Sequence, residues 1–209
     1  MEVSMSDSPR LVLRSVTKTY RNGRSQVEAL APIDLEVARG EFVTLIGPSG
    51  CGKSTLFSII AGIEQPSAGT ITIDGDSQEQ RAGKTGYMPQ TPSLLPWRTV
   101  EENVMLGLDV LRISRKQAHE RAHELLKRFG LVEFATHYPT TLSGGMRQRV
   151  ALLRTVLFNA EFLLLDEPFG ALDALTRLSL QTWLLDLWQS IHASVLFITH
   201  DIREAILLS

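Results

Sequence analysis

The first third of the chain contains short runs of β-forming residues. In two of these runs apolar and polar positions alternate. The runs stand close to turn signals such as Asn22-Gly23 and Asp74-Gly75. The runs are residues 11–13, 33–37 and 69–74. This pattern predicts strands that pair in an antiparallel sheet on the amino-terminal side of the protein.

Continuous apolar runs predict a second kind of strand. Residues 41–46 form one, and they lead through a glycine-rich segment into a helical pattern from Lys53 to Ile60. Residues 162–167 and 194–200 are two more such runs. Strands that are apolar along their whole length belong in a parallel sheet covered on both faces, so these runs predict an α/β core.

The middle of the chain has helical periodicity and helix start signals. Thr99 stands three residues before Glu102, which is the spacing of a capping box, and predicts a helix running towards Val110. Further helices are predicted at 114–130, 143–159 and 173–192. We interpret residues 91–150 as a helical subdomain inserted into the α/β core.

Composition narrows the class of protein. A chain of 209 residues with 44% hydrophobic residues can bury the core of one α/β domain, and a net charge of -2 disfavours nucleic acid as a partner. Its single cysteine, Cys51, excludes an internal disulfide. The first residues do not resemble a signal peptide, and no apolar stretch approaches the roughly 20 residues that span a bilayer. We therefore expect any membrane crossing to be made by other subunits.

The glycine-rich segment after residues 41–46 matches the phosphate-loop pattern G-x-x-x-x-G-K-[ST]. Its residues are Gly47, Pro48, Ser49, Gly50, Cys51, Gly52, Lys53 and Ser54. In such a loop, backbone N–H groups and a helix start bind phosphates, the lysine lies between the β- and γ-phosphates, and the hydroxyl ligates Mg²⁺. The strand–loop–helix context therefore predicts ATP and Mg²⁺ as cofactors.

Two adjacent acids end the apolar run at 162–167. Phosphoryl transfer requires support for a metal ion and an oriented water molecule. We expect Asp166 to hold the Mg²⁺ shell and Glu167 to take the proton from the attacking water. The alternative is a solvated turn, which is a common role for a pair of acids at a strand end.

A Leu-Ser-Gly-Gly segment at residues 142–145 restricts the possible families of phosphate-loop protein further. With it, the chain from Tyr20 to His200 resembles ATP-binding cassette (ABC) proteins, and residues 168–173 follow the two acids as they do in that family. The resemblance implies a P-loop NTPase core with a mostly parallel sheet, an N-terminal antiparallel β subdomain and the inserted helical subdomain, all in one domain of residues 1–209.

The resemblance also implies the active-site residues. Gln90 corresponds to the glutamine that contacts Mg²⁺ or the water, and His200 to the histidine that contacts the γ-phosphate. Tyr20 corresponds to the aromatic residue that stacks on adenine, with an ordinary packing tyrosine as the alternative. The implied catalytic residues are Glu167, His200, Gln90 and Lys53. The implied metal ligands are Ser54, Gln90 and Asp166. The implied ATP contacts are Tyr20, Gly47, Pro48, Ser49, Gly50, Cys51, Gly52, Lys53, Ser54 and Thr55.

Ser143, Gly144 and Gly145 would form a second anion-binding helix start in a chain that already has a phosphate loop. In ABC proteins this second helix start acts in a homodimer, in which the segment closes over the nucleotide held by the other copy. Asp173 resembles the acid that crosses the same interface. The resemblance therefore implies two shared ATP sites in a two-fold dimer.

Met146 and Gly170, together with residues 167–177, resemble the branch of the family that imports nitrate, sulfonate, taurine and related small solutes. This implies an ATP-hydrolysing subunit on the cytoplasmic face of the cell membrane, working with transmembrane permease subunits and a substrate-binding protein. Residues 90–98, with Pro92, Pro96 and Trp97, are candidates for the permease contact, with a packed loop as the alternative. Cassettes of this branch continue beyond residue 209, so we expect a truncated carboxyl-terminal end. A soluble cassette ATPase and a regulatory cassette remain the alternatives.

Overall fold

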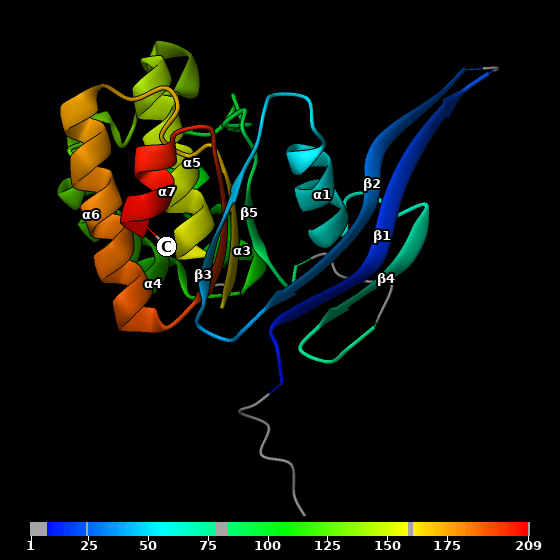
Figure 1. The fold of residues 1–209 in the computed structure, drawn as a ribbon. Coiled ribbons are helices and arrows are strands. Elements are labelled where there is room, and N and C mark those ends of the chain that lie inside the picture. Colours follow the sequence, from blue (N-terminus) through cyan, green and yellow to red (C-terminus); the bar gives the residue numbers. More distant parts are fainter. Residues whose placement is uncertain (1–7, 24, 78–82, 159–160, 209) are drawn as a thin grey trace, which may run out of the picture.

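Two sheets form the framework of the protein. The computed structural model describes residues 8–23, 25–77, 83–158 and 161–208 (Figure 1). An antiparallel sheet has the strand order β2 (Ser25–Val37), β1 (Leu11–Asn22) and β4 (Ala68–Ile73). A parallel sheet has the order β3 (Phe42–Ile46), β7 (Ser194–Thr199), β6 (Phe162–Asp166) and β5 (Gly86–Met88). The predicted combination of a parallel core and an amino-terminal antiparallel sheet is confirmed.

Helices cover both faces of the parallel sheet. The first, α1 (Lys53–Ile60), lies between the two sheets in Figure 1. Between β5 and β6 in the sequence come α2 (Val100–Val104), α3 (Leu106–Val110), α4 (Arg115–Arg128) and α5 (Gly144–Leu157), with single 3₁₀ turns at Val132–Phe134 and Pro139–Thr141. The last are α6 (Ala174–Ile191) and α7 (Ile202–Leu208). The inserted helical segment of the predicted fold is therefore present.

Alternating side chains of the parallel strands supply two hydrophobic cores, because successive residues of a strand point to opposite faces. One core joins the sheet to the helical segment and α6, and its strand residues include Leu163, Leu165, Val195 and Phe197. The other joins the sheet to α1 and the antiparallel sheet, and its strand residues include Phe162, Leu164, Leu196 and Ile198. Burial on both faces explains why β6 and β7 are apolar except at their ends, where Ser194, Asp166 and Thr199 stand.

The structure corrects three details of the predicted elements. The helix expected from Thr99 to Val110 is divided at Met105 into α2 and α3. The second of these packs directly on the end of α5, because a Cβ added to Gly107 would lie 2.9 Å from Phe158. β1 and β2 are longer than predicted, because much of their hairpin is exposed and has no hydrophobic pattern. The strand β5 and the helix α7 were not predicted.

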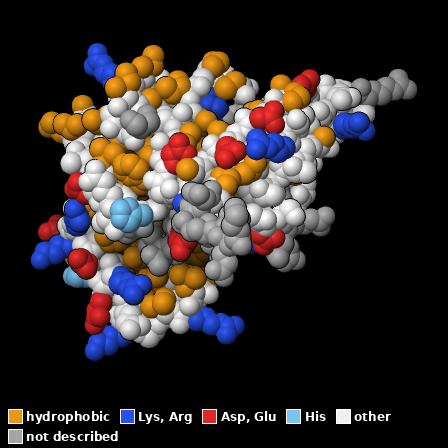
Figure 2. Space-filling model, turned by 60° about the horizontal axis from the view of Figure 1, so that its bottom comes forward, with side chains coloured by type: hydrophobic (Ala, Val, Ile, Leu, Met, Phe, Trp, Pro, Cys, Tyr) orange, Lys and Arg blue, Asp and Glu red, His pale blue; other side chains and the backbone are white. Residues whose placement is uncertain are grey.

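The end of the parallel sheet opposite the phosphate loop is drawn in Figure 2. On this face basic and acidic side chains are interspersed among apolar ones, so neither sign of charge dominates it. Within the part of the chain that the structure describes, no helix combines the length and the apolar character needed to cross a membrane.

Candidate active site

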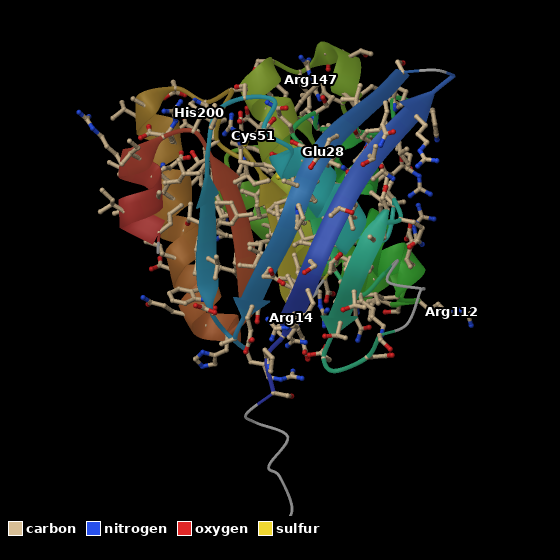
Figure 3. The ribbon with its side chains drawn as sticks, turned by 45° about the vertical axis from the view of Figure 1, so that its right-hand side comes forward. Arg14, Glu28, Cys51, Arg112, Arg147 and His200 are labelled. Carbon is tan, nitrogen blue, oxygen red and sulfur yellow. The ribbon has the colours of Figure 1, made fainter. Side chains whose placement is uncertain are left out.

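The carboxyl ends of the four parallel strands bring the predicted phosphate-loop, metal-binding and catalytic residues to one edge of the sheet. Ile46 pairs with Thr199, and Asp166 pairs with Ile198, so the segments that follow these strands start at the same level. Figure 3 shows Cys51 and His200 at this edge. A cavity of about 200 Å³ opens here, lined by Ala29, Ser49, Gly50, Gly52, Lys53, Ser54, Thr55, Gln90, Asp166 and Glu167. Ligands of open parallel sheets bind at this edge, where strand ends and helix starts meet.

The phosphate loop wraps around the start of α1. Gly52 precedes the helix with φ 94°, and a Cβ on it would lie 2.4 Å from the carbonyl oxygen of Ala29, so only glycine fits. The Lys53 ammonium donates to the carbonyl oxygens of Gly47 (2.7 Å) and Pro48 (2.8 Å). The loop therefore offers a cation and a helix start to an anion in the cavity.

A buried carboxylate stands at the end of β6. Asp166 is 2% exposed, and burial raises its pKa, although a hydrogen bond with Ser54 opposes this shift. Its Oδ2 atom is buried and has no hydrogen-bond partner. An unpaired carboxylate oxygen next to a hydroxyl suits a hard cation such as Mg²⁺, which binds through one or two carboxylates and retains water ligands. Among the described residues no group of three His, Cys, Asp or Glu side chains forms a metal cluster, so a cation here would rely on this small donor set.

Two polar side chains, those of Gln90 and His200, meet at the neighbouring residue, Glu167. The amide nitrogen of Gln90 donates to its carboxylate at 3.1 Å, and Nδ1 of His200 lies 3.5 Å from the same oxygen. Gln90 reaches Glu167 because β5 pairs with β6, the strand that precedes Glu167, and β5 ends two residues before Gln90. The structure thus brings together the three residues expected around the reacting phosphate: Gln90 and Glu167 line the cavity that contains Lys53, and His200 reaches it through Glu167.

Tyr20 lies beside the cavity and does not line it. Its hydroxyl donates to Glu64 at 2.6 Å, and this hydrogen bond raises the pKa of Tyr20; Thr55 also hydrogen-bonds to it. The Lys18 ammonium lies 4.9 Å from the ring centroid. The ring is 40% exposed and close to Thr55, which does line the cavity.

The Ser-Gly-Gly segment and Asp173 form a separate exposed surface. Ser143 caps α5 by accepting from the N–H of Met146 (3.2 Å), and Asp173 caps α6 by accepting from the N–H of Thr176 (3.0 Å). A Cβ on Gly145 would lie 3.3 Å from Ala171, so the two helix starts are adjacent. Ser143, Gly144, Gly145 and Asp173 do not line the cavity of their own chain.

Sequence reasoning missed two contributors to the site. Ala29 lines the cavity from β2, and no local signal could place this strand against the phosphate loop. Gln148 donates from α5 to the carbonyl oxygen of Glu167 (3.1 Å). The sequence could have indicated this contact, because Gln148 is a polar residue at helical spacing from the buried Ala151. A polar residue on the buried face of a helix needs a hydrogen-bond partner inside the protein.

The fold and the cavity define an ATPase of the P-loop type. Residues 30–170 match the model of the ABC transporter family, and the chain belongs to this family. It is similar to an uncharacterized ABC transporter ATP-binding protein of Methanocaldococcus jannaschii, with 44% identity over 96% of this chain and 75% of the relative.

Other relatives have more specific names. The nitrate import ATP-binding protein of Synechocystis is 41% identical over 95% of this chain and 75% of its own length. The taurine import ATP-binding protein of Rhizobium johnstonii is 47% identical over 93% and 74%. A dimeric post-hydrolysis structure of the ATP-binding cassette MJ0796, bound to ADP and Pi, superimposes with a TM-score of 0.88 at 36% identity, covering 94% of this chain and 90% of that one. The present chain is thus an ATP-binding, ATP-hydrolysing cassette.

Proposed function

We propose that the chain is the ATP-hydrolysing subunit of a membrane importer for a small solute such as nitrate, a sulfonate or taurine. The observation that carries the ATPase chemistry is the Glu167 carboxylate, placed between Gln90 and His200 at the rim of a cavity that contains Lys53. The names of the nitrate and taurine import relatives support the class of solute.

In this proposal the phosphate loop binds the triphosphate of ATP, and Tyr20 provides a ring for adenine. Glu167 takes the proton from the attacking water, while Gln90 and His200 orient the reacting groups. Ser54, Gln90 and Asp166 would hold Mg²⁺. The ion, when bound, would neutralise charge that develops on the phosphate oxygens.

The exposed position of residues 143–145 supports an ATP-dependent homodimer. A helix start with free N–H groups attracts anions, yet this one does not line the cavity of its own chain. Two copies related by a two-fold axis would place it, with Asp173, over the nucleotide of the other copy. The dimeric state of the related cassette supports this arrangement.

The importer would contain transmembrane permease subunits and a substrate-binding protein, with the present chain attached to the permease at the cytoplasmic face of the cell membrane. Trp97 is the candidate contact, because its side chain is 72% exposed. The loop around it is fixed by Asn103, whose buried amide bonds to the backbone of Leu95, Arg98 and Thr99. A rigid loop with an exposed aromatic residue suits a protein partner.

We expect Trp97→Ala to abolish solute uptake and to leave basal ATP hydrolysis within about two-fold, because the side chain makes no contact with the cavity. Uptake of nitrate, taurine and an alkylsulfonate is measured in cells that depend on this chain, and hydrolysis with the purified protein. Val27→Ala is the matched control, since Val27 is also exposed, lies on β2 and should leave both activities unchanged.

Two outcomes would contradict the proposal. Loss of uptake and hydrolysis together in Trp97→Ala would show that the permease contact is misplaced. Uptake of all three solutes that does not depend on the chain would exclude an importer of this class.

A further inference from the structure

Two polar side chains of helix α5, Gln148 and Arg154, form hydrogen bonds with the segments that carry the proposed catalytic residues. Gln148 is 4% exposed, and Arg154, further along the same helix, is partly buried. Polar groups in such positions need partners, since burying them unpaired is costly. The partners of both side chains are backbone carbonyl oxygens in the two segments that carry Gln90 and Glu167.

Gln148 fixes the backbone of Glu167. This residue has φ 47°, in the left-handed region that non-glycine residues rarely adopt. Its N–H donates to Ile198 (3.0 Å), and its carbonyl oxygen accepts from Gln148 (3.1 Å). With both backbone groups held, the unusual conformation is maintained and the direction of the carboxylate is set.

Arg154 fixes the turn that follows Gln90. Its two terminal nitrogens donate to the carbonyl oxygens of Ser93 (2.8 Å) and Pro92 (2.9 Å), and Ser93 is itself in the left-handed region with φ 45°. A guanidinium group offers its donors in a planar, rigid fork, so two simultaneous bonds determine the position of the turn. Gln90 lies two residues before this turn and donates to Glu167 at 3.1 Å.

We propose that Gln148 and Arg154 are positioning residues, which hold Glu167 and Gln90 at catalytic separation from a single helix. This inference rests on the proposed function, in which Glu167 is the base and Gln90 orients the reacting groups. The remainder of α5 is suited to the task, because Val150, Ala151, Leu152 and Leu153 are fully buried and keep the helix in place.

Steady-state hydrolysis by Arg154→Met tests the role of this side chain. The variant keeps the apolar stem and loses the fork, so we expect kcat to fall about 10- to 100-fold through misplacement of Gln90. KM for ATP should change by less than about two-fold, since Pro92 and Ser93 do not line the cavity. Arg154→Lys should recover part of the loss, because an ammonium group still supplies a donor.

Arg149→Met is the matched control. Arg149 lies on the same helix and donates to a backbone carbonyl, that of Phe129 (2.8 Å), away from Gln90 and Glu167. Its thermal unfolding should resemble that of Arg154→Met, and its kcat should stay close to that of the unmodified protein. A similar fall in kcat in both variants would show that loss of packing in α5 explains the result, which would overturn the proposal.

A double-mutant cycle separates positioning from a general structural effect. If Arg154 acts through Gln90, adding Arg154→Met to Gln90→Ala should cause no further fall in kcat. Gln148→Met should still lower kcat in the Gln90→Ala background, because it acts on Glu167. Full additivity of Arg154→Met with Gln90→Ala would contradict the inference.

The same cycle distinguishes this inference from the function on which it rests. If Gln90→Ala alone hydrolyses ATP at the normal rate, the proposed role of Gln90 fails. If Gln90→Ala is slow while Arg154→Met and Gln148→Met are normal, the proposed function stands and only the positioning role is excluded.

Discussion

Replacing Glu167 with glutamine should lower kcat for ATP hydrolysis by at least about 100-fold, because the loss of a general base typically removes a factor of this size. Glutamine has the shape of glutamate and can still contact His200, but it cannot accept a proton from water. The cavity and Lys53 are unchanged, so ATP binding should be retained. Phosphate release and equilibrium binding of ATP, measured on the same preparation, separate the two effects.

Glu161→Gln provides the control for this substitution. Glu161 is exposed and pairs with Arg10 (2.8 Å), outside the cavity, so the same chemical change there should leave turnover intact. Normal turnover in Glu167→Gln would remove Glu167 from the role of base. A loss of ATP binding equal to the loss of turnover would assign it a binding role instead.

Lys53→Met should weaken ATP binding by about 100-fold or more, since charge-assisted hydrogen bonds contribute about 1.5–3 kcal/mol each and this ammonium would make several to the phosphates. The variant also loses the two bonds from Lys53 to Gly47 and Pro48, which shape the loop. Titration with ATP in a calorimeter measures the change in Kd directly.

The matched variant is Lys84→Met. Lys84 is a partly exposed lysine that pairs with Asp76 (2.8 Å) and does not line the cavity, so its removal should leave Kd unchanged. An unchanged Kd for Lys53→Met would mean that the triphosphate binds elsewhere, and the assignment of the phosphate loop would fail.

The parts of the fold that could be predicted from the sequence are those with a local signal. The apolar runs at 162–167 and 194–200 became β6 and β7, because burial on both faces requires apolar side chains along the middle of such strands. The capping box at Thr99 is present with both of its hydrogen bonds. By contrast, β5 spans only Gly86–Met88 and depends on pairing with β6, a tertiary contact that three residues cannot signal.

The residues of the candidate site also divide into those that a local motif predicts and those that only tertiary contacts place. Lys53, Asp166 and Glu167 follow from motifs at strand ends, and the parallel register brings those ends together. The contacts of Ala29, Gln148 and Arg154 depend on which elements become neighbours after folding. Arg154 is an arginine in a helical pattern and reads as a surface residue until its two carbonyl partners are known.

The central claim is that two copies share their ATP sites, and mixing two inactive variants tests it most directly. Lys53→Met damages the phosphate loop, and Ser143→Arg blocks the helix start that would cover the partner's nucleotide. Each variant alone should be inactive. An equal mixture should recover about a quarter of the normal ATPase rate, because half of randomly formed dimers are mixed and each mixed dimer has one complete site. A mixture as inactive as its components, or full activity of Ser143→Arg alone, would contradict the shared site.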